Sequence, residues 1–112
     1  MSDATVDVET SPDGSLLIHP HGALGIDEAV ELRRTLVYAV RHLRPMRLIL
    51  DLNDVSHLDP INAGTLAATC YLGDDHAVAV FLDHCSAAIA GQLSAAGIAR
   101  HRLRHIKHHS PA

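Results

Sequence analysis

Aromatic side chains are scarce in this sequence. They make up 3% of its 112 residues, and tryptophan is absent, although 47% of the residues are hydrophobic. A core must therefore be built from Leu, Ile, Val and Ala. Carbohydrate-binding and base-stacking surfaces rely on aromatic faces, so the composition argues against both. The length favours one domain with one core.

Features that mark membrane, secreted and nucleotide-binding proteins are also missing. No apolar run approaches the ~20 residues that a membrane span needs, and the first ten residues are acidic where a secretory signal is basic and then apolar. No GxxxxGK(S/T) or GxGxxG motif occurs. We therefore expect a cytoplasmic protein with no membrane span and no cofactor.

Cysteine is limited to Cys70 and Cys85, and no CxxC spacing is present. In a cytoplasmic chain two such residues indicate reduced thiols in apolar surroundings rather than a disulfide. A redox pair remains the alternative interpretation.

Charge is unevenly distributed along the chain. Residues 1–99 carry five arginines against all 13 acids, which gives −8, whereas residues 100–112 carry three arginines and one lysine, which gives +4. An acidic body argues against nucleic-acid binding. We interpret residues 100–112 as a solvated basic, histidine-rich tail.

The stretch 47–64 is the most informative part of the sequence. Residues 47–52 form a compact apolar run typical of a central strand, and residues 53–56 have short polar side chains that favour a turn. Asp59 precedes Pro60, which suits the first turn of a helix because its missing N–H would have no partner there. The stretch predicts a strand, an exposed loop and a helix capped by Asp59.

Periodicity and turn residues predict the remaining elements. In chain order these are an edge strand at 5–10, a turn at 11–14, a strand at 15–19, a glycine loop at 20–25, a helix from Ile26 that Pro45 stops, a helix at 62–72, a strand at 76–82, a helix at 86–96 capped by Asp83 and ended by Gly97, and a short last strand within 100–109. Alternating β and α elements predict a single α/β domain over residues 1–112, with a core at about 5–107 and a mixed four- to five-stranded sheet.

With this order of elements, the sequence resembles the STAS domain family of bacterial anti-sigma factor antagonists over roughly residues 5–107. Family members carry a Gly-Glu-Leu-Asp loop after the second strand, where this chain has Gly-Ala-Leu-Gly at 22–25. Residues 51–64, DLNDVSHLDPINAG, match the family's motif between the third strand and the following helix, and residues 83–98 match the region after the fourth strand. The resemblance implies a regulatory protein of bacterial signal transduction that binds an anti-sigma factor of the serine kinase type and controls transcription without being an enzyme.

The chemical positions of the motif depart from the family pattern. In typical members the Ser after the motif Asp is phosphorylated, and the added charge breaks the complex; here that position is Pro60, followed by Ile61. Asn62 replaces a glycine, and Gly25 replaces the acid of the loop. The usual switch is therefore lost, and the nearest hydroxyls that remain as substitutes are Ser56 and Thr65.

The resemblance leaves several roles open. We expect constitutive binding of the anti-sigma factor as a monomer or weak homodimer; the alternative is an adaptor, scaffold or ligand-sensing module, for example of a stressosome or an ABC transport complex. A ligand-sensing role predicts a cavity beneath residues 22–25. The contact surface implied by the family consists of Leu24, Gly25, Leu58, Asp59, Pro60, Ile61, Asn62 and Gly64.

Two other kinds of chemistry are disfavoured. His101, His105, His108 and His109 would share a helical face, but their neighbours are cationic and would repel a metal ion, so we expect no metal site. Ser56, His57 and Asp59 contain the residue types of a catalytic triad, but neighbours in one loop seldom reach its geometry.

Overall fold

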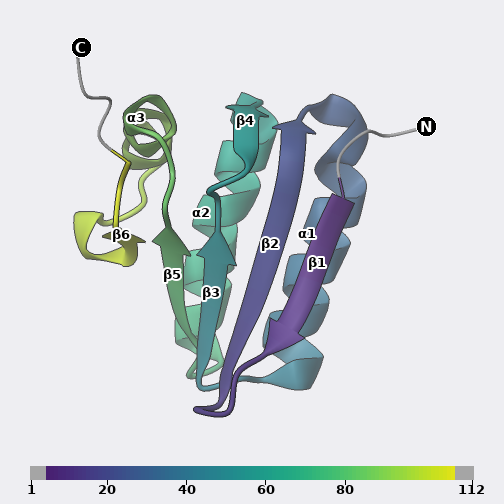
Figure 1. The fold of residues 1–112 in the computed structure, drawn as a ribbon. Coiled ribbons are helices and arrows are strands. Elements are labelled where there is room, and N and C mark those ends of the chain that lie inside the picture. The colour runs from purple at the N-terminus through teal and green to yellow at the C-terminus, as the bar shows by residue number, and fades with distance from the viewer. Residues whose placement is uncertain (1–4, 108–112) are drawn as a thin grey trace.

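The structure, a computed structural model, describes residues 5–107. Its strands and helices follow one another as β1 (Thr5–Thr10), β2 (Ser15–Leu24), α1 (Ala29–Tyr38), β3 (Arg47–Asp51), β4 (Val55–Leu58), α2 (Pro60–Asp75), β5 (Ala79–Asp83), α3 (Ala87–Ala95) and β6 (Leu103–Arg104). The predicted α/β class is confirmed (Figure 1). The short helical turns η1 (Ile26–Glu28) and η2 (Ala39–Leu43) extend α1 at its two ends, and η3 (Arg100–Arg102) precedes β6.

The sheet is mixed, as predicted, but it has six strands rather than four to five. Its order is β1-β2-β3-β5-β6, and β4 pairs with the far end of β2. The β1–β2 pair is antiparallel and the other pairs are parallel. The strand that was not predicted is β4. Its two buried residues, Val55 and Leu58, flank two exposed polar residues, so the sequence does not alternate between apolar and polar residues as a strand usually does.

Strand β2 is longer than predicted and contains much of the expected glycine loop. Its first half pairs with β3 over residues 15–18, and its second half pairs with β4 over residues 22–24. Gly22 has φ +85° at a register shift within the β2–β4 pairing, a conformation that glycine adopts without strain. Pro20 lies between the two parallel pairings and opposite Val6 of β1, and a proline, which has no N–H to donate, is best tolerated where pairing is interrupted.

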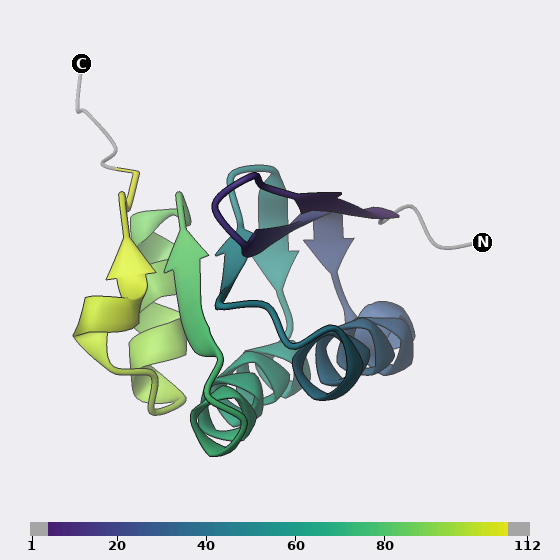
Figure 2. The ribbon, with the colours of Figure 1, turned by 90° about the horizontal axis from the view of Figure 1, so that it is seen from below.

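The helices α1 and α2 lie side by side against one face of the sheet (Figure 2), and α3 packs beside α2. The core between the layers is aliphatic, as the composition requires. Its fully buried side chains include Ile18, Leu48, Leu50 and Leu82 from the strands and Leu32, Leu36, Leu66 and Leu93 from the helices.

Several predicted boundaries were wrong. Helix α2 continues past Gly73 to Asp75. Gly73 serves close packing rather than helix termination, since a Cβ there would lie 2.6 Å from the Val78 carbonyl oxygen and 2.7 Å from Cγ2 of Val80 in β5. Asp83 does not cap α3 but ends β5. The cap is Ser86, whose Oγ accepts a hydrogen bond from the Ile89 N–H at 3.1 Å.

Residues 100–107 belong to the fold and are not a solvated tail. Leu103 in β6 is buried, and the Arg104 guanidinium donates two hydrogen bonds to the Asp83 carboxylate at 2.8 and 2.9 Å. Arg102 donates from Nη2 to both carboxylate oxygens of Asp74, at 2.9 Å each. Two of the basic side chains, Arg102 and Arg104, are thus held by acids near the ends of α2 and β5. Residues 108–112, with His108 and His109, lie outside the described part.

Candidate functional site

The start of α2 is built as the sequence predicted. Asp59 is the N-cap, and its carboxylate accepts a hydrogen bond from the Ile61 N–H at 3.0 Å. Pro60 occupies the first helical position. Two further bonds fix the end of β4 below this turn: the Asp59 N–H donates to the Leu24 carbonyl at 2.9 Å, and the Gln92 side chain donates to the Leu58 carbonyl at 2.8 Å. The turn is therefore held by β2 and α3 together.

Asn62 has a structural role that the sequence did not indicate. Its side chain is completely buried, and its Nδ2 donates to the carbonyl oxygens of Leu24 at 2.7 Å and Gly25 at 2.8 Å. These bonds attach the first turn of α2 to the end of β2. The residue that replaces the family's glycine thus joins the two segments of the expected contact surface.

The predicted contact residues divide into a buried group and an exposed group. Leu24, Leu58 and Asn62 are buried, so their side chains are not available to a partner. Gly25 and Asp59 are partly exposed. The surface itself is formed by the exposed Pro60, Ile61 and Gly64.

Gly64 is exposed inside a helix, and no internal contact explains it. A Cβ at this position would meet no atom within 4 Å. Glycine in a helix interior costs ~0.5–1 kcal/mol relative to alanine. The bare backbone at Gly64, beside Ile61, therefore suits close approach of another molecule.

The two hydroxyls suggested as substitutes differ in accessibility. Ser56 is exposed on β4. Thr65 is partly buried, and its Oγ1 donates to the Ile61 carbonyl at 3.2 Å. Ser56 is the more accessible of the two.

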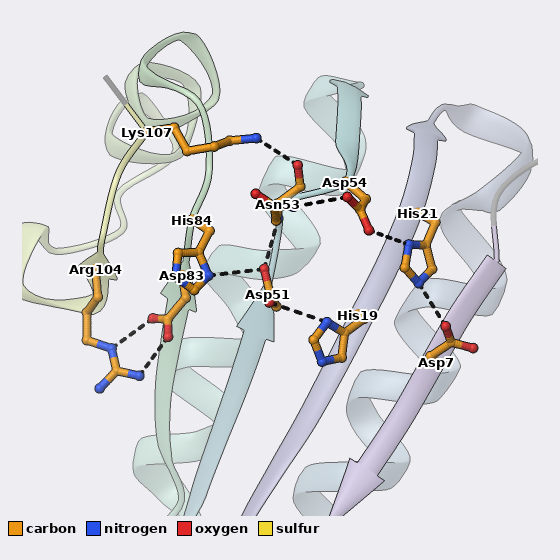
Figure 3. A network of polar contacts seen from close by, with 10 residues as sticks. All are labelled: Asp7, His19, His21, Asp51, Asn53, Asp54, Asp83, His84, Arg104 and Lys107. Atoms are coloured by element: carbon orange, nitrogen blue, oxygen red, sulfur yellow. Dashed lines mark hydrogen bonds and ion pairs between the residues drawn. The ribbon is translucent and has the colours of Figure 1, made fainter. Parts of the chain in front are cut away.

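A polar network that sequence reasoning missed covers the sheet face opposite the helices (Figure 3). Asp51, at the end of β3, lies 3.3 Å from the Nδ1 atoms of both His19 and His84. His21 lies between two carboxylates, with Nε2 at 2.8 Å from Asp7 and Nδ1 at 2.9 Å from Asp54. The alternation of His19 and His21 along β2 was the available signal, since alternate strand residues share a face.

The geometry of His21 favours its charged form. Both ring nitrogens face carboxylate oxygens, and only the imidazolium has a proton for each. The hydrogen bond to Asp7 is the largest effect that raises the pKa of His21 above its ordinary value, and Asp54 adds to it. Within residues 5–107, no group of three or more His, Cys, Asp or Glu side chains is placed to hold a metal ion.

Cys70 and Cys85 are free and buried, as predicted. Burial raises the pKa of Cys70 to about 11 and also raises the pKa of Cys85, so both remain thiols near neutral pH.

The triad-like loop residues have other roles. The carboxylate of Asp59 caps α2 rather than orienting His57, and both Ser56 and His57 are exposed on β4.

Two hollows open on the helix side, and neither lies beneath residues 22–25. The smaller one, about 390 Å³, lies between α1 and α2 and includes Ile61, Gly64 and Thr65 in its lining. The larger one, about 910 Å³, lies between α1 and the first two strands. In the described part of the chain, no helix has the length and apolar character to cross a membrane.

Comparisons with solved structures identify the type of fold. No protein-family model and no curated protein matches the sequence. An anti-sigma factor antagonist from Mycobacterium paratuberculosis matches with a TM-score of 0.75 at 23% identity, over 92% of this chain and 86% of that chain. The Bacillus cell fate determinant SpoIIAA in its phosphorylated form matches with a TM-score of 0.75 at 14% identity, over 92% of each chain.

A variant of RsbS from Moorella thermoacetica matches with a TM-score of 0.74 at 12% identity, over 91% of this chain and 86% of that chain. At such identities a structural likeness establishes the fold. This chain therefore has the STAS-type fold of the anti-sigma factor antagonists.

Proposed function

We propose that this protein is an anti-sigma factor antagonist that binds an anti-sigma factor of the serine kinase type in the cytoplasm, without the usual phosphorylation switch. The observation that carries the proposal is the start of α2. On a fold of this type, an exposed proline occupies the first helical position, directly after the capping Asp59.

The missing hydroxyl decides the mode of regulation. A phosphate on the first turn of α2 would add a charge of about −1.5 to −2 and change the electrostatics of the contact surface. Pro60 has no hydroxyl, and neither has Ile61, so this position cannot receive a phosphate. Phosphorylation at this position therefore cannot break a complex formed through this surface.

The exposed side chains support a binding surface. Ile61 is 53% exposed although it is strongly hydrophobic, and Gly64 beside it presents bare backbone. The hollow between α1 and α2 borders both residues. A partner side chain that enters this hollow would cover Ile61 and gain apolar burial.

The proposal is tested by affinity capture from the native cytoplasm with an Ile61→Arg, Gly64→Arg double variant. A Tyr71→Arg variant is the control, because Tyr71 is 65% exposed on the same helix but does not border the hollow. We expect wild type and control to recover a serine kinase anti-sigma factor, identified by mass spectrometry, and the double variant to lose it. If all three proteins recover the same partners, or none recovers an anti-sigma factor, the adaptor or scaffold role takes its place.

The switch is tested with the captured kinase and ATP. We expect wild type to remain unmodified and a Pro60→Ser variant to become phosphorylated and to release the kinase. Phosphate on Ser56 or Thr65 of wild type would instead show a displaced switch.

A further inference from the structure

An open apolar groove runs along the side of α1 that faces away from α2. Its floor is formed by Val8 of β1 and by Leu16 and Ile18 of β2, which belong to the helix side of the sheet. Its wall is formed by α1 and η2, with Val30, Arg33, Arg34, Val37, Tyr38 and Leu43 among the lining residues. Its volume is about 910 Å³. We call this feature the α1 groove.

The α1 groove concentrates the exposed hydrophobic side chains of the protein. Eight large hydrophobic residues are exposed within the described part of the chain, and four of them line the groove. These four are Val8 (49% exposed), Val30 (62%), Tyr38 (56%) and Leu43 (49%). Contiguous exposed apolar surface of this kind marks a site of association.

The charges beside the groove are unpaired cations. Arg33 and Arg34 are exposed and, among residues 5–107, lie within ion-pair distance of no carboxylate. Three arginines in the described part have carboxylate partners, namely Arg47 with Asp13, Arg102 with Asp74 and Arg104 with Asp83, and none of these three lines the groove. Because the body is acidic overall, two unpaired cations on one apolar groove point to carboxylates supplied from outside.

We propose that the α1 groove docks an acidic amphipathic helix of a partner protein. The groove lies between α1 and the helix-facing side of β1 and β2, which is the place a further helix of the same layer would fill. Val30 to Leu43 extend over roughly 20 Å at ~1.5 Å per residue, which matches a docked helix of three to four turns. The apolar face of that helix would cover Val8, Val30 and Tyr38, and its carboxylates would reach Arg33 and Arg34.

Two other occupants fit less well. A second copy of this chain, docked groove to groove about a two-fold axis, would bring Arg33 and Arg34 toward the same cations of its partner. A lipid surface is contacted by protruding apolar side chains, whereas Leu16 and Ile18 lie buried at the floor of a concavity.

The test uses synthetic peptides of about 14 residues and isotope-labelled protein. One peptide has Leu at helical spacing with Glu on its flanks, the second is a scramble of the same composition, and the third has Lys in place of Glu. We expect only the first to shift the amide NMR signals of β1 and α1. An Arg33→Glu, Arg34→Glu variant should weaken its binding by about tenfold or more.

The control variant is Arg100→Glu, Lys107→Glu, which changes the net charge equally at exposed positions by the β6 edge of the sheet, opposite the groove at β1. We expect it to change the affinity by less than about twofold, since distant surface charges are largely screened by salt. Arg33 lines the smaller hollow as well, whereas Ile61 and Gly64 line only that hollow. An Ile61→Arg, Gly64→Arg variant should therefore bind the peptide like wild type, which separates this site from the surface proposed for the anti-sigma factor.

Several results would overturn the proposal. These are equal binding of the acidic and scrambled peptides, an equal loss in the two charge-reversal variants, or signal shifts confined to α2. Self-association in analytical ultracentrifugation that Arg33→Glu, Arg34→Glu abolishes would instead assign the groove to a second copy. Binding of phosphatidylglycerol vesicles without binding of the peptide would assign it to a membrane surface.

Discussion

The side chain of Asn62 sets the position of α2 relative to the end of β2. Its Nδ2 bonds join the helix to the carbonyls of Leu24 and Gly25, which lie 38 and 37 residues earlier in the chain. Both carbonyl oxygens also accept backbone N–H donors, from Asp59 and Glu28. Loss of the amide would therefore remove two bonds without leaving these acceptors unpaired.

We predict that Asn62→Ala lowers the free energy of unfolding by about 1–3 kcal/mol, from two lost hydrogen bonds and a small cavity. Urea unfolding followed by circular dichroism measures the change. Ser94→Ala is the control, because Ser94 is exposed on α3, and its effect should stay below about 0.5 kcal/mol. Equal effects of the two substitutions would show that Asn62 does not hold the helix.

Replacing Gly64 or Gly73 by alanine should change the free energy of unfolding in opposite directions, although both residues lie in α2. Gly64→Ala should raise the free energy of unfolding by about 0.5–1 kcal/mol, since a methyl group there meets open space. Gly73→Ala should lower it, because its methyl group would lie 2.6 Å from the Val78 carbonyl oxygen. Thermal unfolding of the two variants measures whether each substitution raises or lowers the stability. A loss of stability in Gly64→Ala would contradict the interpretation of Gly64 as a surface glycine.

At the scale of elements, the far end of β2 is held by charged contacts from both sides. His21 joins Asp7 of the edge strand β1 to Asp54 of the turn before β4. Asp51 similarly joins β2 to the residue after β5 through His19 and His84. These contacts lie on the sheet face without helices. Of the three imidazoles, His21 is the one that links both β1 and the turn before β4 to β2, so its protonation affects how firmly these elements are held.

We predict that the contribution of His21 to stability depends on pH. Its folded pKa is raised above the unfolded value of 6.5, so the contribution is fully present below about pH 6.5 and is lost as the pH rises through the folded pKa. The stability difference between wild type and His21→Asn should therefore be larger at about pH 6 than at about pH 9. Urea unfolding at both pH values measures it, and His101→Asn, at an exposed position, serves as control. A difference independent of pH would show that His21 is neutral in the fold.

At the scale of the whole molecule, the last described segment completes the sheet and the core. Leu103 is 9% exposed and packs in the core cluster, while the Arg104 guanidinium lies 4.3 Å from the centre of the Phe81 ring. The basic residues after residue 99 are therefore part of the globular unit as far as Lys107, whose Nζ donates to the Asn53 carbonyl at 2.7 Å.

We predict that Leu103→Ala destabilises the whole domain by about 2 kcal/mol, because it removes buried apolar surface and leaves a cavity. Arg100→Ala, at an exposed position, should change the stability by less than about 0.5 kcal/mol. A two-state unfolding transition that shifts as a whole would confirm that β6 is coupled to the core. An unchanged midpoint for Leu103→Ala would show that the segment is dispensable.

Local signals predicted the elements whose formation is governed by neighbouring residues. Asp59 before Pro60 marked the start of α2. Gly97, which has φ +100°, marked the end of α3. β4 was missed because four residues are too few for a periodic pattern, and its pairing partner lies more than 30 residues away. Asp83 was misassigned for the same reason: its partner Arg104 is 21 residues distant, whereas a cap is judged from adjacent residues.

The sequence alone therefore determined the α/β class, the aliphatic core, the capped start of α2 and the absence of a hydroxyl at Pro60, because each depends on composition or on residues within one turn. Only the tertiary structure decided that Asn62 is buried, that His21 lies between two carboxylates and that Arg33 and Arg34 border an open apolar groove. These features depend on side chains that the chain brings together from distant positions, and no local pattern records which of them meet.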